Sequence, residues 1–277
     1  MHHKAITTKG AWGWKVVRLE GPHLRLSDVE YAIAARLNLG LNSFPARAMA
    51  LLPEHCPRCL NKHAGQPVSL QSEPWHWLTC TSVISGEVTR RHDAVVDAIA
   101  RVASMVGAQV KREVEGLSRG SAQRPDLQIV FPDRMLLTDV VVSHSLTASN
   151  VLSGRSTAAD RQRRKNTKYG SVAARIGAEL LNVSIDTCGG MASDALKLVE
   201  AIAEEGERWT AGTWSRGEIE RRLLGAIAVA VQRGNALAML TGYSRARASG
   251  EGRRGRTAAG GMSVRRGEEV DEVWGTE

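Results

Sequence analysis

Two aspartates in the middle of the chain have the type and spacing of ligands for one metal ion. Asp126 and Asp139 lie at equal distances from the Pro132–Asp133 bond, within the apolar segments 126–131 and 135–142. Such segments around a Pro-Asp turn predict a β-hairpin. In a hairpin with a symmetric loop the two carboxylates lie opposite each other, close enough to share one Mg²⁺ ion, and without a cation they repel each other.

Two other interpretations of this pair stay open from the residues alone. Pro132-Asp133 suits a type I turn better than the primed turns of tight hairpins, and a bulged loop would shift the strand register by one residue. Alternatively, Asp126 only marks the start of a strand and Asp139 belongs to a solvated face.

A basic segment follows the hairpin. Residues 155–175 contain seven basic residues and one acidic residue, and segment 158–178 has the pattern of a helix. Lys165 and Lys168 are three residues apart and share one helix face. A lysine beside metal-bound carboxylates can hold an attacking water and neutralise charge that builds up on a phosphoryl group. The neighbouring arginines either contact nucleic-acid phosphates or form a solvated cationic face.

Three cysteines and a histidine upstream have the spacing of a structural zinc site. The ligand set is Cys56, Cys59, His76 and Cys80, three thiolates and an imidazole that close a tetrahedral shell and leave no open position for catalysis. His55 and His63 are possible substitute ligands, and reduced cysteines near an unrelated histidine are the alternative. Cys188 stands apart and is expected to be a small buried side chain.

The remaining pattern predicts a mixed α/β (α+β) fold. Ser27 to Glu30 form a capping box at the start of a helix that extends to residue 39. An apolar stripe at helical spacing follows in residues 86–106. Helices packed on a mixed sheet are expected, with strands at 108–115, 126–131, 135–142 and 179–186, and helices at 158–178, 193–208 and 216–235.

Charge and composition favour a polyanionic partner. The formal net charge is +8 and the sequence pI is near 9.7, which favours binding to nucleic acid. No run of about 18 apolar residues and no secretory segment is visible, so a soluble intracellular protein without a membrane partner is expected. Residues 244–267 hold seven arginines and one glutamate. This tail is expected to be disordered, and either binds phosphates non-specifically or is simply solvated.

In their order along the chain, these motifs resemble the C-terminal part of site-specific non-LTR retrotransposon proteins. Those proteins end in a CCHC zinc knuckle followed by a restriction-enzyme-like endonuclease. The resemblance covers roughly residues 27–235. It rests on the Cys/His set, Arg91-His92-Asp93, Arg124-Pro125-Asp126, Asp139, and Lys165 with Lys168-Tyr169.

The resemblance implies a nuclease core of the PD-(D/E)xK type whose lysine has moved from the second catalytic strand to the following helix. Val141 stands two residues after Asp139, where that strand would otherwise carry the lysine. The implied domains are an N-terminal helical segment (1–52), the zinc knuckle (53–83), the endonuclease (86–240) and the tail (241–277).

The resemblance also implies the roles of individual residues in a nuclear, Mg²⁺- and Zn²⁺-dependent DNA nickase. Its partner would be the target DNA, with the RNA of the element as a further candidate partner. Glu113 would be a further candidate ligand. The implied catalytic residues are Asp126, Asp139, Lys165, Lys168 and Tyr169, with the two aspartates as Mg²⁺ ligands. The implied nucleic-acid contacts are Arg91, His92, Arg124, Arg161, Arg163 and Arg164. His92 falls on the apolar stripe, which favours packing or orienting a neighbour.

The chain departs from the family pattern in two places. The segment from Ser153 to Ala159 looks like an insertion, which leaves the choice between Lys165 and Lys168 open. There is no Asp-Asp pair in the chain, so the catalytic motif of the reverse transcriptase is absent and at most DNA cutting is expected. The alternatives are a catalytically inactive zinc-containing nucleic-acid-binding remnant and a resolvase-like cellular nuclease.

Overall fold

The computed structural model describes residues 11, 13–16, 21, 24–57, 59, 68–73, 75–115, 124–144 and 157–255. The chain divides into two compact units. The first, here the sheet unit, comprises Met1–Arg25 and Thr89–Gly234, and the second, here the cysteine unit, comprises Leu26–Val88 and Asn235–Glu277. Two long helices, α5 (Thr81–Met105) and α9 (Arg216–Gly255), contribute residues to both units.

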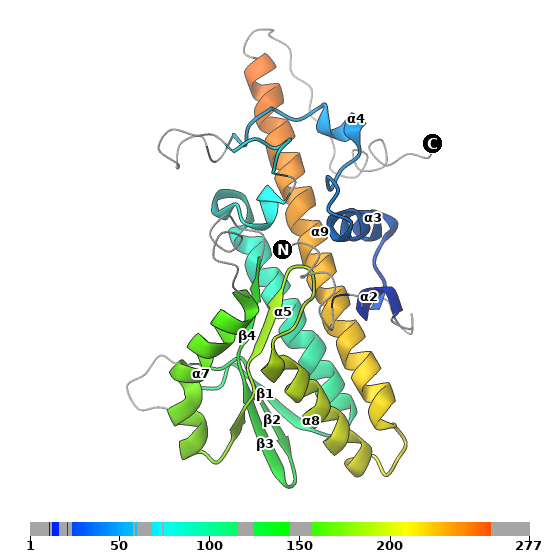
Figure 1. Cartoon of the computed structure of the whole chain (residues 1–277), viewed down its shortest axis with the longest axis vertical. Coiled ribbons are helices and arrows are strands. Elements are labelled where there is room, and N and C mark those ends of the chain that lie inside the picture. Colours follow the sequence, from blue (N-terminus) through cyan, green and yellow to red (C-terminus); the bar gives the residue numbers. More distant parts are fainter. Residues whose placement is uncertain are drawn as a thin grey trace. The chain divides into compact units, whose positions relative to one another are not determined.

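The sheet unit contains a mixed sheet in two parts (Figure 1). Four strands lie in the order β1, β2, β3, β5, with antiparallel pairs up to β3 and a parallel pair between β3 and β5. β4 and β6 form a separate parallel pair. The strands are β1 (Gln109–Arg112), β2 (Leu127–Phe131), β3 (Arg134–Thr138), β4 (Val140–Ser143), β5 (Glu179–Leu180) and β6 (Val183–Asp186). One residue separates β3 from β4, and two separate β5 from β6.

The hairpin between β2 and β3 has the symmetric register. Phe131 pairs with Arg134 across the two-residue loop, and Leu127 pairs with Thr138 at the open end. The next opposed positions are Asp126 and Asp139, as the sequence predicts for a symmetric loop. The alternative of a bulged loop with a shifted register is therefore wrong.

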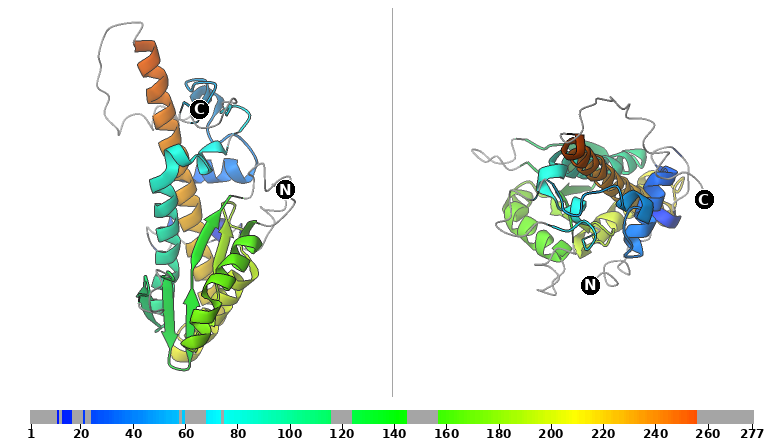
Figure 2. Two further views of the ribbon diagram at one scale, coloured as in Figure 1. Left: turned by 90° about the vertical axis from the view of Figure 1, so that its left-hand side faces the viewer. Right: turned by 90° about the horizontal axis from the view of Figure 1, so that it is seen from above.

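Helices cover both faces of the sheet (Figure 2). On one face, Ile129 and Leu136 belong to a buried apolar cluster with residues of α5, α8 (Ser193–Trp209) and α9. On the other face, Leu137 packs against Val172 and Ala173 of α7 (Thr157–Arg175). The short helix α2 (Gly13–Val16) belongs to the same unit. The expected mixed α/β fold with helix-flanked sheet is confirmed.

The cysteine unit has its own apolar core. It contains α3 (Asp28–Asn38), α4 (Ala46–Met49), the 3₁₀ helix η2 (His76–Leu78) and the C-terminal part of α9. The predicted capping box is present, since Ser27 Oγ accepts from the Glu30 N–H and Glu30 Oε2 accepts from the Ser27 N–H. Phe44 is buried in this core, with its ring centroid 4.7 Å from that of Tyr243.

Helix α9 differs from the prediction. It continues to Gly255 instead of ending near residue 235, so it includes the first part of the segment expected to be disordered. Residues 256–277 lie outside the described residues. Within the described part of the chain, α9 is the one helix whose length and composition would suffice to cross a membrane. However, 78% of its most apolar window is buried inside the protein, which is typical of a core helix.

Candidate functional sites

Asp139 lies at the break between β3 and β4 and is almost fully buried, with 3% of its surface exposed. Its carboxylate forms an ion pair with Nζ of Lys165, which projects from α7. Burial raises the pKa of the Asp139 carboxyl above its ordinary value, and the charge of Asp126 raises it further, whereas the contact with Lys165 lowers it. The three groups therefore interact electrostatically, as the motif spacing predicts.

Asp126 is held by a histidine from α5. Its Oδ2 lies 3.1 Å from Nε2 of His92 and accepts the backbone N–H of Val140 at 2.6 Å. On the other side of the ring, Nδ1 of His92 lies 3.0 Å from Oδ1 of Asp93. The bond with Asp126 is the main reason why the pKa of His92 rises to about 9. Each candidate metal ligand thus has one basic partner, and His92 orients a neighbour as expected.

The structure separates the two lysines that the sequence leaves as alternatives. Lys165 contacts Asp139, whereas Lys168 donates a hydrogen bond to the hydroxyl of Tyr169 at 2.7 Å. The Tyr169 hydroxyl in turn donates to the backbone carbonyl of Arg124 at 3.3 Å. Burial, followed by Asp139, raises the pKa of Tyr169. Tyr169 therefore fastens α7 to the segment that precedes Asp126.

Two further residues at this site were missed by the sequence analysis. The N–H of Asp139 donates to Oδ1 of Asn182, and Nδ2 of Asn182 donates to Oδ1 of Asn166 on α7. The only signal in the sequence is that Asn182, a polar residue, stands between the apolar residues Leu181 and Val183 of the predicted strand 179–186.

The residues expected to contact nucleic acid fall into two classes. The side chains of Arg161, Arg163 and Arg164 are exposed along α7, and Arg163 pairs with Asp160. The Arg124 side chain is 58% exposed and lies 3.0 Å from Glu115. Arg91 differs, since only 3% of it is exposed and burial lowers its pKa to about 10. A guanidinium so enclosed has no surface on which to receive a phosphate, so the prediction does not fit its position.

Glu113 lies beside Asp126 in the backbone but brings no third ligand. Its N–H donates to the carbonyl of Asp126 at 2.9 Å, and its φ of 46° is in the left-handed region. Its side chain is exposed. Within the described residues, the Cys/His set is the only place where three or more His, Cys, Asp or Glu ligand atoms gather.

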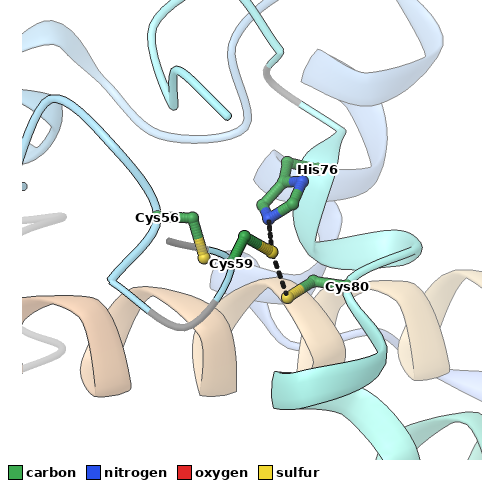
Figure 3. A group of neighbouring side chains, drawn as sticks. All are labelled: Cys56, Cys59, His76 and Cys80. Carbon is green, nitrogen blue, oxygen red and sulfur yellow. Dashed lines mark hydrogen bonds between the residues drawn. The ribbon is translucent and has the colours of Figure 1, made fainter. Parts of the chain in front are cut away.

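The four zinc-type ligands come together in the cysteine unit, as the spacing predicts (Figure 3). Their ligand atoms all lie within 4.8 Å of one another, and all four residues are buried, reduced and free of disulfides. Cys59 Sγ lies 3.3 Å from His76 Nε2 and 3.4 Å from Cys80 Sγ.

The local fold brings the two halves of this set together. The N–H of Cys56 donates to the Val68 carbonyl at 2.9 Å, which closes the loop that carries the first pair. His76 begins η2, and Cys80 directly precedes α5. The hydrogen bond with Cys56, followed by burial, raises the pKa of Cys80. Buried thiols of this kind deprotonate when a metal binds, so the set fits a metal ion such as zinc. His55 is not among the gathered ligands, and His63 lies outside the described residues.

Comparison with family models gives no match for this chain, and no curated protein matches it either. The geometry of its sites is therefore the guide to what the protein does, because a fold alone does not define an activity.

Proposed function

We propose that this protein is a divalent-metal-dependent DNA endonuclease that nicks one strand, built on a core of the PD-(D/E)xK type. The observation that carries the proposal is the meeting of Asp139 with Lys165 of α7, beside the opposed position of Asp126. Two acids on a hairpin and a lysine on the next helix are the arrangement that the motif resemblance implies.

The donor set fits a magnesium ion. Mg²⁺ in proteins is commonly held by one or two carboxylates, with waters and a substrate phosphate completing the shell. Asp126 and Asp139 supply two hard oxygen donors at opposed positions of the hairpin, and they already interact through their charges. When bound, the ion would lower the pKa of a coordinated water and polarise the phosphate.

The other residues of the site would position the reacting groups and neutralise the charge that builds up on the phosphate. The Lys165 ammonium could donate to the attacking water and to the non-bridging phosphate oxygens, which gain charge as the bond breaks. The water oxygen would bond to phosphorus as the bond to the 3′ oxygen breaks. The attacking water would lose a proton to the solvent and the 3′ oxygen would take one up from the solvent, giving a 5′-phosphate and a 3′-hydroxyl. His92 would keep the carboxylate of Asp126 in place.

Nucleic-acid binding would come from surfaces outside the reacting centre. Arg161 and Arg164 of α7 are exposed and precede Lys165 in the chain, so they could contact phosphates of the bound strand near the cut. Such contacts position a strand without reading its sequence. In this proposal the metal ion of the cysteine unit is zinc with a structural role, as in a zinc knuckle.

The test is nicking of supercoiled plasmid with Mg²⁺ by the wild type, Asp126→Ala and Asp139→Ala. Asp133→Ala is the matched control, because Asp133 is an exposed aspartate in the turn of the same hairpin. Nicking should be lost in the first two variants and kept in the control. Activity that survives in Asp139→Ala would rule the mechanism out.

The same assay separates the other candidate functions. Salt-sensitive binding to DNA without cleavage under Mg²⁺ or Mn²⁺ would indicate an inactive nucleic-acid-binding remnant. Cleavage that prefers four-way junctions over linear duplex would indicate a resolvase-like nuclease.

A further inference from the structure

Two neighbouring parallel strands are interrupted at the same level of the sheet. β3 and β4 are separated by Asp139, and β5 and β6 by residues 181–182. Leu137 pairs with Leu180 below the interruption and Val140 pairs with Val183 above it. Paired residues are 43 positions apart in the sequence on both sides of the interruption. Asp139 and Asn182, which are also 43 positions apart, are therefore opposite each other at the break.

A side-chain amide replaces a backbone partner at this break. The ladder bond from the Val183 N–H to the Asp139 carbonyl is present at 3.0 Å. In a regular parallel ladder, the N–H of Asp139 would donate to a backbone carbonyl of the neighbouring strand. It donates instead to Oδ1 of Asn182 at 3.1 Å. Asn182 is fully buried, and a buried amide is costly unless it is hydrogen-bonded.

The other end of the Asn182 amide connects to α7. Its Nδ2 donates to Oδ1 of Asn166 at 2.6 Å, and Nδ2 of Asn166 donates to Oδ2 of Asp194 at 2.9 Å. Gln162 of α7 accepts the Asp194 N–H at 3.1 Å. A continuous path of hydrogen bonds therefore leads from the backbone of Asp139, through the Asn166 side chain, to the first turn of α8.

This path lies next to both candidate reacting groups, Asp139 and Lys165. Asn166 directly follows Lys165 in the chain, and Asn182 bonds to the residue that pairs with Lys165. Apolar packing of α7 on Leu137 is non-directional, whereas hydrogen bonds require a defined distance and angle. The two amides are thus directional contacts that, in addition to the bond of the Tyr169 hydroxyl, hold α7 in place relative to Asp139.

We infer that Asn166 and Asn182 are positioning residues that set the Lys165 ammonium against the Asp139 carboxylate. Their consequence for cleavage rests on the proposed function. The contact between the Lys165 and Asp139 side chains can be measured without DNA cleavage.

An exchange of partners tests this inference. In Asn166→Asp, the new carboxylate can still accept from Asn182 but cannot donate to Asp194, and the two carboxylates repel each other. In the double variant Asn166→Asp with Asp194→Asn, the amide at position 194 donates to the carboxylate at position 166. The path is restored and the net charge is that of the wild type. Thr167→Asp is the matched control, since it adds the same charge at the next, exposed position of α7.

Two readouts are needed. The first is the single-turnover nicking rate at saturating protein, together with the Kd for DNA. The second is the rate at which acetic anhydride modifies Lys165 relative to Lys168, measured by mass spectrometry without DNA or metal. Asn166→Asp should nick on the order of 10- to 100-fold more slowly, with the DNA affinity of Thr167→Asp, and its Lys165 should be modified faster. The double variant should return both quantities towards the wild type. If Asn166→Asp does not fold, Asn166→Ala replaces it, and slower nicking with faster modification of Lys165 is again expected.

The outcomes separate the two proposals. If Lys165 in Asn166→Asp is modified at the wild-type rate, or if the double variant restores neither quantity, the positioning role is overturned. If the wild type does not cut DNA, but Lys165 becomes reactive in Asn166→Asp and is protected again in the double variant, the positioning role stands and the nuclease proposal fails.

Discussion

Nε2 of His92 lies 3.1 Å from Oδ2 of Asp126, and this contact makes the stability of the sheet unit depend on pH. The bond raises the pKa of His92 to about 9, from an unfolded value near 6.5. A raised folded pKa gives a stabilisation that is fully present below about pH 6.5 and lost as the pH rises through about 9. His92→Gln should therefore lower the free energy of unfolding by about 1–3 kcal/mol at low pH.

The measurement is urea unfolding of the wild type and His92→Gln between pH 6 and pH 10. The difference between the two should shrink above pH 9. His55→Gln is the control, because among the described residues its acidic partner is Glu54, at the longer distance of 3.9 Å. An equal deficit of His92→Gln at pH 6 and pH 10 would show that packing, and not charge, accounts for the effect.

The two lysines of α7 should differ sharply in their effect on cleavage. Lys165→Ala removes the cation that contacts Asp139, so the nicking rate should fall by roughly 100- to 1,000-fold, as for other lost electrostatic stabilisers. Lys168→Ala removes only a donor to the Tyr169 hydroxyl, and its rate should fall much less. Single-turnover nicking at saturating protein checks both. A larger loss in Lys168→Ala would exchange their proposed roles.

The parts of the site that depend on local spacing were predictable from the sequence. The hairpin register follows from the equal distances of Asp126 and Asp139 to the turn, because a two-residue loop fixes every pair outward from it. The Cys/His set follows from short spacings that place both ligands of each half together. Cys188 is buried as expected, and burial raises its pKa to about 12.

The parts that depend on contacts between distant segments were not predictable. At the break, the N–H of Asp139 bonds to an amide 43 residues away in the chain, that of Asn182. Nothing in the apolar segment 135–142 indicates this partner. Arg91 belongs to the motif Arg91-His92-Asp93, yet its position on α5 buries its side chain in the interior of the sheet unit. For such residues, tertiary packing decides the environment and composition does not.

For the last part of α9, the amino-acid composition led to a wrong prediction of disorder. Arginine and glycine dominate residues 244–255, which is typical of a solvated tail. However, buried residues recur at helical spacing just before and within this segment, at Ala236, Met239, Tyr243 and Ala246. Their contacts with the core of the cysteine unit are long-range, so the helix gains a stabilisation that the local sequence does not reveal.

Removing the metal should unfold the cysteine unit. Binding to a closed set of three thiolates and an imidazole couples to folding with a free energy on the order of 10 kcal/mol. We expect about one zinc per chain in purified protein, and loss of that zinc and of cooperative unfolding in Cys59→Ser. Elemental analysis and thermal melting measure these two quantities. Cys188→Ser is the control, since Cys188 lies outside the gathered ligands. Full zinc content in Cys59→Ser would exclude the assignment.

The packing of α9 on the cysteine core should tolerate no side chain at Gly242. A Cβ atom there would overlap the indole ring of Trp77, which is 3% exposed and adjoins His76 of the metal set. Gly242→Ala should therefore cost about 1–3 kcal/mol of unfolding free energy through overpacking, although alanine normally favours a helix. Gly217→Ala, in open space on the same helix, should instead stabilise by roughly 0.5–1 kcal/mol. Urea unfolding of both variants checks this, and equal stabilisation would show that Trp77 does not pack against Gly242.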